Sequence, residues 1–398
     1  MQNRIVILAA GDGTRWENFR GTTKHHTTVE GETLIERQIR QFSQHTSDIV
    51  MVAKNLTENF SSVKVFTPEQ DPRWLDMAKF KSSNEFWGDE RTVLAFGDVY
   101  FTDEAIDSIV NDDQEITFYL RKRKSSITGK PYKEIFALSF NASAKPKLQR
   151  WIEELIDQKI ANVSGGWFLY FKMLEELNLD LSDGFEREIG FVHIDDWTED
   201  FDFPIDLLHW EKRRAGLQSN LAILEQIVVE VPNYWTALHQ LQHEHFLNQR
   251  WHDVLTIGSK ALAIWCPWNL ERSASYLWSA EAACELGYFD WALDWADRAL
   301  RSSPLFFEPK GFLAHMAFMR EDWSSCFKFA IQIETHNKLQ SHYTRDFYWD
   351  WYMFDLIALS SFHLKRKDEA IHFGRLALEG NPSEMRLEQD LRLYESMS

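Results

Sequence analysis

The sequence contains few cysteines and lacks a long hydrophobic run at its start. Three cysteines occur among 398 residues, at positions 266, 284 and 326, and none forms a Cys-x-x-Cys pair. This argues against a disulfide framework and against a cysteine-based zinc site, and the reducing cytoplasm is the expected location. The apolar run at 5–10 is too short for a signal sequence or a membrane span, so neither is expected.

The sequence also lacks an excess of positive charge. It has 43 Lys and Arg residues against 61 Asp and Glu residues, which gives a net charge of -18. Residues 1–200 hold 34 acids and 24 bases (-10), and residues 201–398 hold 27 acids and 19 bases (-8). Either half would repel a phosphate backbone at long range, so no nucleic-acid partner is expected.

Short apolar runs alternate with segments of helical spacing in the first half. After a strand at 4–10, strands are expected at 49–53, 63–66, 93–96, 116–120, 135–140 and 167–171. Helices are expected at 34–42, 103–110, 147–158 and 172–177. The alternation predicts an α/β domain with a mostly parallel sheet over residues 1–212.

An internal repeat replaces the strand pattern from residue 217 onward. Two groups of five residues share the same mutual spacing: Ala292, Ala296, Ala299, Leu300 and Pro304, and Ala370, Gly374, Ala377, Leu378 and Pro382. The spacing resembles the tetratricopeptide repeat, a helical hairpin in which small residues let paired helices pack closely. We therefore expect an all-α solenoid of about four repeats over residues 217–398, with about ten extra residues near 338–346. Its concave surface would suit a protein partner.

A glycine-containing turn follows the first predicted strand. Residues 8–15 read Leu-Ala-Ala-Gly-Asp-Gly-Thr-Arg. Gly11 and Gly13 allow the backbone to wrap closely around phosphate groups and to present its amide N–H groups as donors. Arg15 can add a bidentate contact to phosphate, and Lys24 follows nine residues later. This pattern predicts a phosphate-binding site at the end of the strand.

The run and its spacing to Lys24 resemble the N-terminal signature of the sugar-phosphate nucleotidyltransferases, a family with a Rossmann-like fold. Gly97-Asp98 after a strand and Asp-Phe-Asp-Phe-Pro-Ile-Asp-Leu at 200–207 are similar to two later segments of that family. Gly165-Gly166 and the aromatic residues behind it resemble the segment under the acceptor. The resemblance covers residues 5–207.

The resemblance implies a role for each matching residue. Nucleotide-binding residues would be Ala10, Gly11, Gly13, Thr14, Arg15 and Gly97, and acceptor-binding residues would be Gly165 and Gly166. Lys24 would bridge the attacking and α-phosphate oxygens. Asp98 and Asp202 would hold Mg²⁺, with Asp200 as the alternative to Asp202.

The implied activity is transfer of a nucleoside monophosphate from an NTP to a phosphorylated small molecule, with release of pyrophosphate. The acceptor would be a sugar 1-phosphate, as in nucleotide-sugar biosynthesis, or a molecule of the phosphocholine type. No protein nucleophile is needed, because the acceptor phosphate is already ionised. Two alternatives stay open: a nucleotide-sugar glycosyltransferase, although residues 97–100 lack an Asp-x-Asp motif, and a non-catalytic nucleotide-binding scaffold.

Some features depart from the family or compete with it. Thr23 stands where the family commonly has proline, and Gly88 is the only glycine between Gly31 and Gly97, so the base-reading segment cannot be assigned. The basic run at 121–124 is expected at a solvated hairpin tip or facing an acidic acceptor or partner. The spacing of His239 and His243 would allow metal binding, but a repeat helix is the preferred interpretation.

Overall fold

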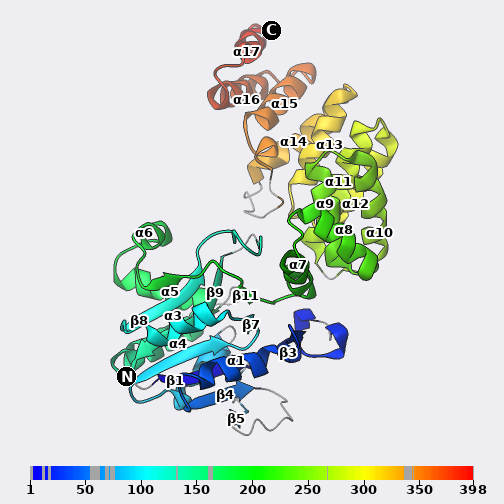
Figure 1. Ribbon diagram of the computed structural model, residues 1–398. Coiled ribbons are helices and arrows are strands. Elements are labelled where there is room, and N and C mark those ends of the chain that lie inside the picture. The colour runs from blue at the N-terminus through cyan, green and yellow to red at the C-terminus, as the bar shows by residue number, and fades with distance from the viewer. Residues whose placement is uncertain are drawn as a thin grey trace. The chain divides into compact units, whose positions relative to one another are not determined.

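The chain forms two compact units in the computed structural model, Met1–Gly216 and Leu217–Ser398. The structure describes residues 3–397 apart from 11–13, 17–18, 54–62, 68–70, 72–76, 131–132, 160–164, 267, 336–342 and 344. Figure 1 shows the first unit as a sheet with helices and the second as helices. Among the described residues, no helix combines the length and apolar character needed to cross a membrane.

A seven-stranded sheet forms the centre of the first unit, in the order β10-β8-β9-β6-β1-β4-β5. The strands are β1 (Asn3–Ala9), β4 (Ile49–Ala53), β5 (Lys64–Phe66), β6 (Arg91–Phe96), β8 (Ile116–Arg121), β9 (Glu134–Asn141) and β10 (Phe191–His193). β1 pairs in parallel with β4 and β6, whereas β9 runs antiparallel to β6 and β8. The prediction of a mostly parallel α/β sheet is confirmed.

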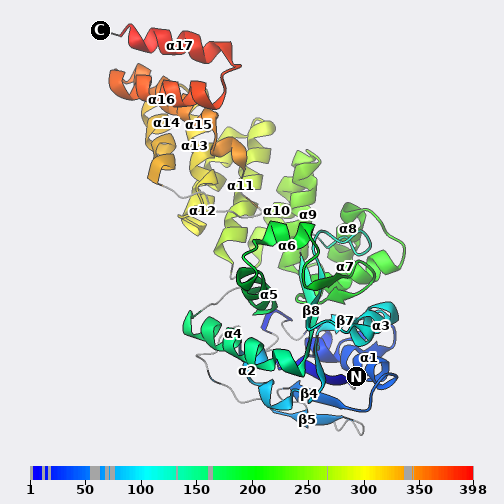
Figure 2. The same cartoon turned by 90° about the vertical axis from the view of Figure 1, so that its left-hand side faces the viewer.

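Helices cover both faces of this sheet. They are α1 (Leu34–Ser43), α2 (Ala78–Lys81), α3 (Asp103–Asn111), α4 (Lys145–Asp157), α5 (Gly165–Glu176), α6 (Leu181–Glu186) and α7 (Pro204–Arg214). Figure 2 shows α1 and α3 on one side of the sheet and α2, α4 and α5 on the other. Residues Ile5–Ala9 of β1 are buried throughout, as expected for a central strand covered on both faces.

The predicted strand at 167–171 is wrong, because these residues belong to α5. The buried positions of α5 are Gly165, Gly166, Leu169, Tyr170, Met173 and Leu174. They recur every three to four residues, which is the period of a helix that buries one face. A Cβ atom on Gly166 would lie 3.4 Å from Ile135 Cγ2 and 3.5 Å from Phe96 Cζ, so glycine permits close packing of the helix on the sheet.

Paired helices build the second unit. The helices are α8 (Asn220–Glu230), α9 (Trp235–Leu247), α10 (Trp251–Ala263), α11 (Asn269–Glu285), α12 (Phe289–Ser302), α13 (Glu308–Met319), α14 (Trp323–Ala330), α15 (Trp351–His363), α16 (Lys367–Gly380) and α17 (Met385–Glu395). Ala292, Ala296 and Ala299 are fully buried in α12, as repeat packing requires. The predicted all-α, tetratricopeptide-like architecture is confirmed.

A segment between α14 and α15 packs against α9, α11 and α13, which are the first helices of three successive helical hairpins. Tyr343 lies against His239 of α9 and Trp278 of α11, with ring centroids 5.6 and 5.7 Å apart. Arg345 forms an ion pair with Glu281 of α11, and Trp349 Nε1 donates a hydrogen bond to Glu308 of α13 at 2.9 Å. The face formed by these first helices is therefore partly covered by the chain itself.

Candidate active site

The end of β1 and the end of β6 meet at the edge of the sheet where the signature loop begins. The Gly97 N–H donates a hydrogen bond to the Leu8 carbonyl at 3.0 Å. A Cβ atom at Gly97 would lie 2.9 Å from the Ala9 Cβ, so a larger residue would push the two strand ends apart. This close approach brings the strand end that precedes Asp98 next to the end of β1, after which the predicted phosphate-binding turn begins.

Three aspartates from two distant segments converge at this edge. Candidate ligand atoms of Asp98, Asp200 and Asp202 all lie within 4.8 Å of one another. Two short strands bring them together: β7 (Val99–Tyr100) pairs antiparallel with β11 (Glu199–Asp200), with Val99 opposite Asp200. The Phe201 N–H also donates to the Asp98 carbonyl at 3.2 Å. Asp200 and Asp202 are therefore both part of the cluster, rather than one being the alternative to the other.

Lys24 occupies the centre of this acidic cluster. Its side chain forms an ion pair with Asp98 and lies 3.5 Å from Asp202 Oδ1, and the residue is only 8% exposed. Burial opposes the charged form of Lys24, but Asp98, Asp200 and Asp202 outweigh burial and raise its pKa. Burial likewise opposes the charged form of Asp98, yet Lys24, His25 and Lys79 hold the pKa of Asp98 well below its usual range.

Arg15 joins the same cluster from the other side of the loop. Its guanidinium lies 3.1 Å from Asp202 Oδ1 and over the ring of Phe203 at 5.1 Å, while much of the side chain stays exposed. Trp16 next to it is buried in an apolar cluster with Tyr100, Phe201, Leu207 and Trp210. The loop end is thus anchored to the segment that carries Asp200 and Asp202. Gly11 and Gly13 lie outside the described residues, and Thr14 begins the short helix Thr14–Trp16.

The three aspartates fit a hard cation. All three donors are carboxylate oxygens, the ligands that Mg²⁺ prefers. Asp200 Oδ1 is buried and has no hydrogen-bond partner within the described residues. Burial and the charges of Asp202 and Asp98 raise the pKa of Asp200 well above its ordinary value. A divalent cation would supply a counter-charge for the ionised form of the Asp200 carboxylate.

Comparison with known proteins gives a family match in the first unit. Residues 5–125 match the family described as the MobA-like NTP transferase domain. The N-terminal unit contains a MobA-like NTP transferase domain. Asp98 lies inside the matched range, whereas Asp200 and Asp202 lie beyond it. No sequence among the curated proteins matches the chain.

Solved structures with a similar chain trace include two nucleotidyltransferases and a helical protein. A glucose-1-phosphate thymidylyltransferase from Bacillus anthracis is 13% identical, with a TM-score of 0.38 over 55% of this chain and 97% of that one. A CTP:phosphocholine cytidylyltransferase from Streptococcus pneumoniae is 16% identical, with a TM-score of 0.38 over 53% of this chain and 99% of that one. MamA is 13% identical, with a TM-score of 0.35 over 49% and 99%.

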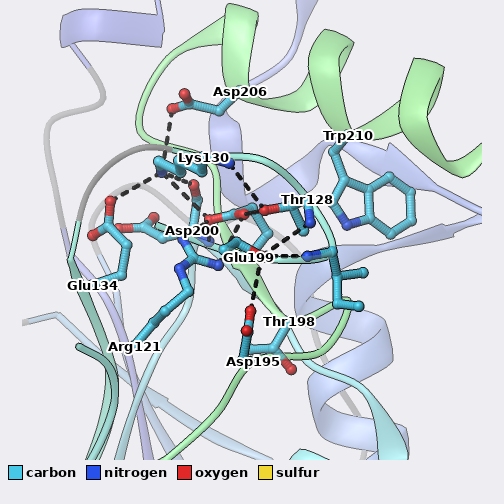
Figure 3. A network of polar contacts seen from close by, with 12 residues as sticks. Arg121, Thr128, Lys130, Glu134, Asp195, Thr198, Glu199, Asp200, Asp206 and Trp210 are labelled. Atoms are coloured by element: carbon cyan, nitrogen blue, oxygen red, sulfur yellow. Dashed lines mark hydrogen bonds and ion pairs between the residues drawn. The ribbon is translucent and has the colours of Figure 1, made fainter. Parts of the chain in front are cut away.

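A buried ionic network supports the aspartate cluster of the transferase domain. Arg121 forms an ion pair with Glu199 at 2.8 Å, with side chains 0% and 2% exposed. Lys130 Nζ donates to the Asp200 carbonyl at 2.6 Å and lies 3.2 Å from Glu134 and 3.7 Å from Asp206. Figure 3 shows Lys130 between these acids, beside the Arg121–Glu199 pair. The network holds the backbone of β11 in place at Asp200.

The sequence pattern did not reveal this network. Arg123 and Lys124 are exposed in the connection from β8 to β9, as expected for a solvated hairpin tip, but Arg121 departs from that expectation because it ends β8 and points into the interior. The next residue, Lys122, pairs with Glu188, whose side chain is 65% exposed. The alternation of side chains along a strand explains why one member of the basic run is buried and its neighbour is not.

Gly165, Gly166 and His239 are the remaining candidate residues. Gly165 and Gly166 form the buried first turn of α5, and their acceptor-binding role stays a prediction. His239 is stacked between Trp235 and Trp278, with ring centroids 4.7 and 4.9 Å away, and its Nδ1 lies 2.6 Å from Ser275 Oγ. His239 is therefore a core residue of the repeat. In the part of the chain that the structure describes, the three aspartates form the only group with metal-ligand geometry.

Proposed function

We propose that the protein is an Mg²⁺-dependent nucleotidyltransferase that moves a nucleoside monophosphate from an NTP to a phosphorylated small molecule and releases pyrophosphate. The observation that carries the proposal is the convergence of Lys24, Asp98, Asp200 and Asp202 at the carboxyl ends of β1 and β6. This is the edge of an α/β sheet where nucleotides bind. Lys24 and Asp98 lie inside the range that matches the NTP transferase family.

The residues of the cluster meet the electrostatic demands of this reaction. An oxygen of the acceptor phosphate attacks the α-phosphorus of the NTP, the bond from the α-phosphorus to the bridging oxygen breaks, and pyrophosphate leaves. Negative charge accumulates between two anions, so positioning and charge neutralisation must lower the barrier. Asp98, Asp200 and Asp202 would hold Mg²⁺, which supplies a Lewis acid for the phosphate oxygens when bound.

The backbone amides, Arg15 and Lys24 would each contact a different part of the substrates. The backbone amides of residues 10–14 would bind phosphate oxygens, whereas the Gly97 N–H is already bonded to the Leu8 carbonyl. Arg15, whose side chain is largely exposed, would clamp the leaving pyrophosphate. Lys24 is buried, so its ammonium is held in one place. From there it would bridge the attacking and α-phosphate oxygens as a point charge.

The acceptor is proposed to be a sugar 1-phosphate or a molecule of the phosphocholine type, bound near Gly165 and Gly166. Nucleotide-sugar biosynthesis in the cytoplasm is the corresponding setting. The helical unit would recruit a protein partner, which the tetratricopeptide-like hairpins support. A partner would meet only part of the surface formed by the first helices of the hairpins, because Tyr343, Arg345 and Trp349 cover some of that surface.

Pyrophosphate release tests the proposal. The full chain is incubated with Mg²⁺ and each of the four common NTPs, against a panel of sugar 1-phosphates and phosphocholine. We expect release with one NTP and one acceptor class, and its loss in Asp98→Asn. NTP binding without release for every acceptor would contradict the proposal and support a nucleotide-binding scaffold. Hydrolysis or transfer from a nucleotide sugar without pyrophosphate release would instead support a glycosyltransferase.

A further inference from the structure

A second lysine lies beside the aspartate cluster and has no place in the mechanism above. Lys79 belongs to α2, between β5 and β6. Its ammonium lies over the ring of Phe96 at 3.9 Å from the centroid, and 5.4 Å from the centroid of Phe80. Phe96 ends β6, two residues before Asp98. Lys79 therefore lies against the strand end that precedes Asp98.

The charge of Lys79 is left without a partner in direct contact. Within the described residues no carboxylate forms an ion pair with it and no acceptor receives its hydrogen bonds, whereas Lys81 in the same helix pairs with Glu153. Burial lowers the pKa of Lys79, and the nearby charge of Lys24 adds to this effect. The attraction of Asp98, Asp200 and Asp202 opposes the shift without cancelling it.

An ammonium in this position suits an anion that arrives from solution. Removing an ammonium from water without a counter-charge costs free energy, and the faces of aromatic rings recover only part of that cost. The aspartates that attract Lys79 are the groups that would hold the metal, so their charge would be largely neutralised in the loaded site. Lys79 would then be a free cation next to the phosphates of the substrate.

We propose that Lys79 binds a phosphate oxygen of the substrate held at the aspartate cluster. The proposal rests on the function proposed above and adds a substrate-binding residue from the segment between Gly31 and Gly97, where base recognition could not be assigned. The phosphate belongs either to the NTP or to the acceptor, and kinetics separate these two sources.

The test compares Lys79→Met and Lys79→Arg with Lys81→Met, a matched control two residues along the same helix. For each full-length variant, KM and kcat are measured for the NTP and for the acceptor, NTP binding is measured by calorimetry, and thermal unfolding is recorded. We expect Lys79→Met to raise one KM about 10- to 100-fold, the typical effect of losing a charge-assisted hydrogen bond. Lys79→Arg should retain part of the affinity, and Lys81→Met should match the wild type.

Stability gives a readout that a purely structural role would not produce. Because the ammonium has no ion-pair or hydrogen-bond partner within the described residues and a methionine side chain can also pack on Phe96, Lys79→Met should melt at or above the wild-type temperature while it loses substrate affinity. If Lys79→Met does not fold, Lys79→Gln replaces it.

An increase in the KM for the NTP assigns the phosphate to the nucleotide, and an increase in the KM for the acceptor assigns it to the acceptor. Unchanged KM values in a folded Lys79→Met variant would overturn the role of Lys79. Pyrophosphate release by the wild type would still support the proposed function in that case. A wild-type protein that neither binds NTP nor releases pyrophosphate would overturn both.

Discussion

Asp200 shows how one residue acquires a role that its sequence neighbourhood conceals. Five other acids lie between 195 and 206, so sequence proximity alone does not single it out. The β7–β11 pairing places Asp200 beside Asp98, and the alternating geometry of an extended chain returns Asp202 to the same side. Asp200 Oδ1 is buried and has no hydrogen-bond partner among the residues that the structure describes, which makes Asp200 a candidate ligand.

Substitution of Asp200 should weaken divalent-cation binding without unfolding the protein. Mn²⁺ binding is measured by electron paramagnetic resonance for the wild type, Asp200→Asn and the control Asp113→Asn, an exposed residue outside the cluster. We expect at least about a tenfold loss of affinity in Asp200→Asn, since even changes outside the ligand shell cost 10–100-fold. Equal affinities for Asp200→Asn and Asp113→Asn would exclude Asp200 from the metal site.

His239 should make the helical unit sensitive to acid. Burial, with a smaller effect from the charge of His243, lowers the pKa of His239 to about 3. Between pH 7 and pH 5 the unfolded chain takes up a proton at this residue and the folded chain does not, so the free energy of unfolding falls by about 2 kcal/mol. Urea titrations at both pH values should show that the free energy of unfolding decreases less in His239→Gln than in the wild type, by this amount. An identical decrease in both proteins would contradict the assignment.

At the scale of elements, two strands of two residues each depend on buried charge for their position. β11 carries Glu199 on one side and Asp200 on the other, and Arg121 at the end of β8 anchors Glu199. Removing one partner of a buried ion pair leaves an uncompensated charge inside the protein. The Glu199 carboxylate also accepts a hydrogen bond from the Asp200 N–H at 3.2 Å, so the position of Asp200 should depend on the Arg121–Glu199 pair.

Glu199→Gln should destabilise the first unit by about 3–5 kcal/mol, because Arg121 would remain buried without its counter-charge. The matched control is Lys122→Met, which removes an exposed ion pair from the next residue and should cost no more than about 1 kcal/mol. Urea unfolding of both variants gives the comparison. Similar losses would mean that the Arg121–Glu199 pair contributes no more than a surface pair.

The element scale also marks the limit of prediction from this sequence. The predicted strands that correspond to β1, β4, β6, β8 and β9 are confirmed, since each is an apolar run bounded by turns. The apolar run in α5 fits either a strand or a buried helix, and its sequence alone does not decide between them. The convergence of Lys24, Asp98 and Asp202 agrees with the family resemblance. The Arg121–Glu199 pair depends on strand pairing over 78 positions, which no local pattern reveals.

The segment between α14 and α15 should act as a structural link between hairpins. Tyr348 is 4% exposed, fits over Gly311 and donates a hydrogen bond to Glu281 at 3.1 Å. Tyr348→Ala should cost the helical unit about 3–5 kcal/mol, as for other buried aromatic residues. Phe347→Ala is the control, because Phe347 is 46% exposed and its ring stacking is worth only about 1 kcal/mol. Equal effects of the two changes on urea unfolding would rule out a linking role for Tyr348.

At the scale of the whole molecule, each unit has core clusters of its own. The clusters of the first unit lie within residues 5–210, and a large cluster of the second lies within residues 254–394. Each unit is also large enough to bury a core without the other.

The chain shortened to residues 1–216 should therefore fold and keep its pyrophosphate release, if the helical unit only recruits a partner. Circular dichroism and the kcat of the shortened chain test this expectation. A shortened chain that is folded but inactive would show that the helical unit contributes to catalysis, and an unfolded one would show that the units stabilise each other.

The central claim is that the protein transfers a nucleotide onto a phosphorylated acceptor at the site formed by Asp98, Asp200, Asp202 and Lys24. Phosphorus-31 NMR of the full chain with Mg²⁺, the NTP and the acceptor found by the pyrophosphate screen observes the new phosphoanhydride bond directly. The account predicts one nucleotidylated acceptor for each pyrophosphate released, with both signals absent in Asp98→Asn. Pyrophosphate without the adduct, or the adduct formed equally well by Asp98→Asn, would contradict it.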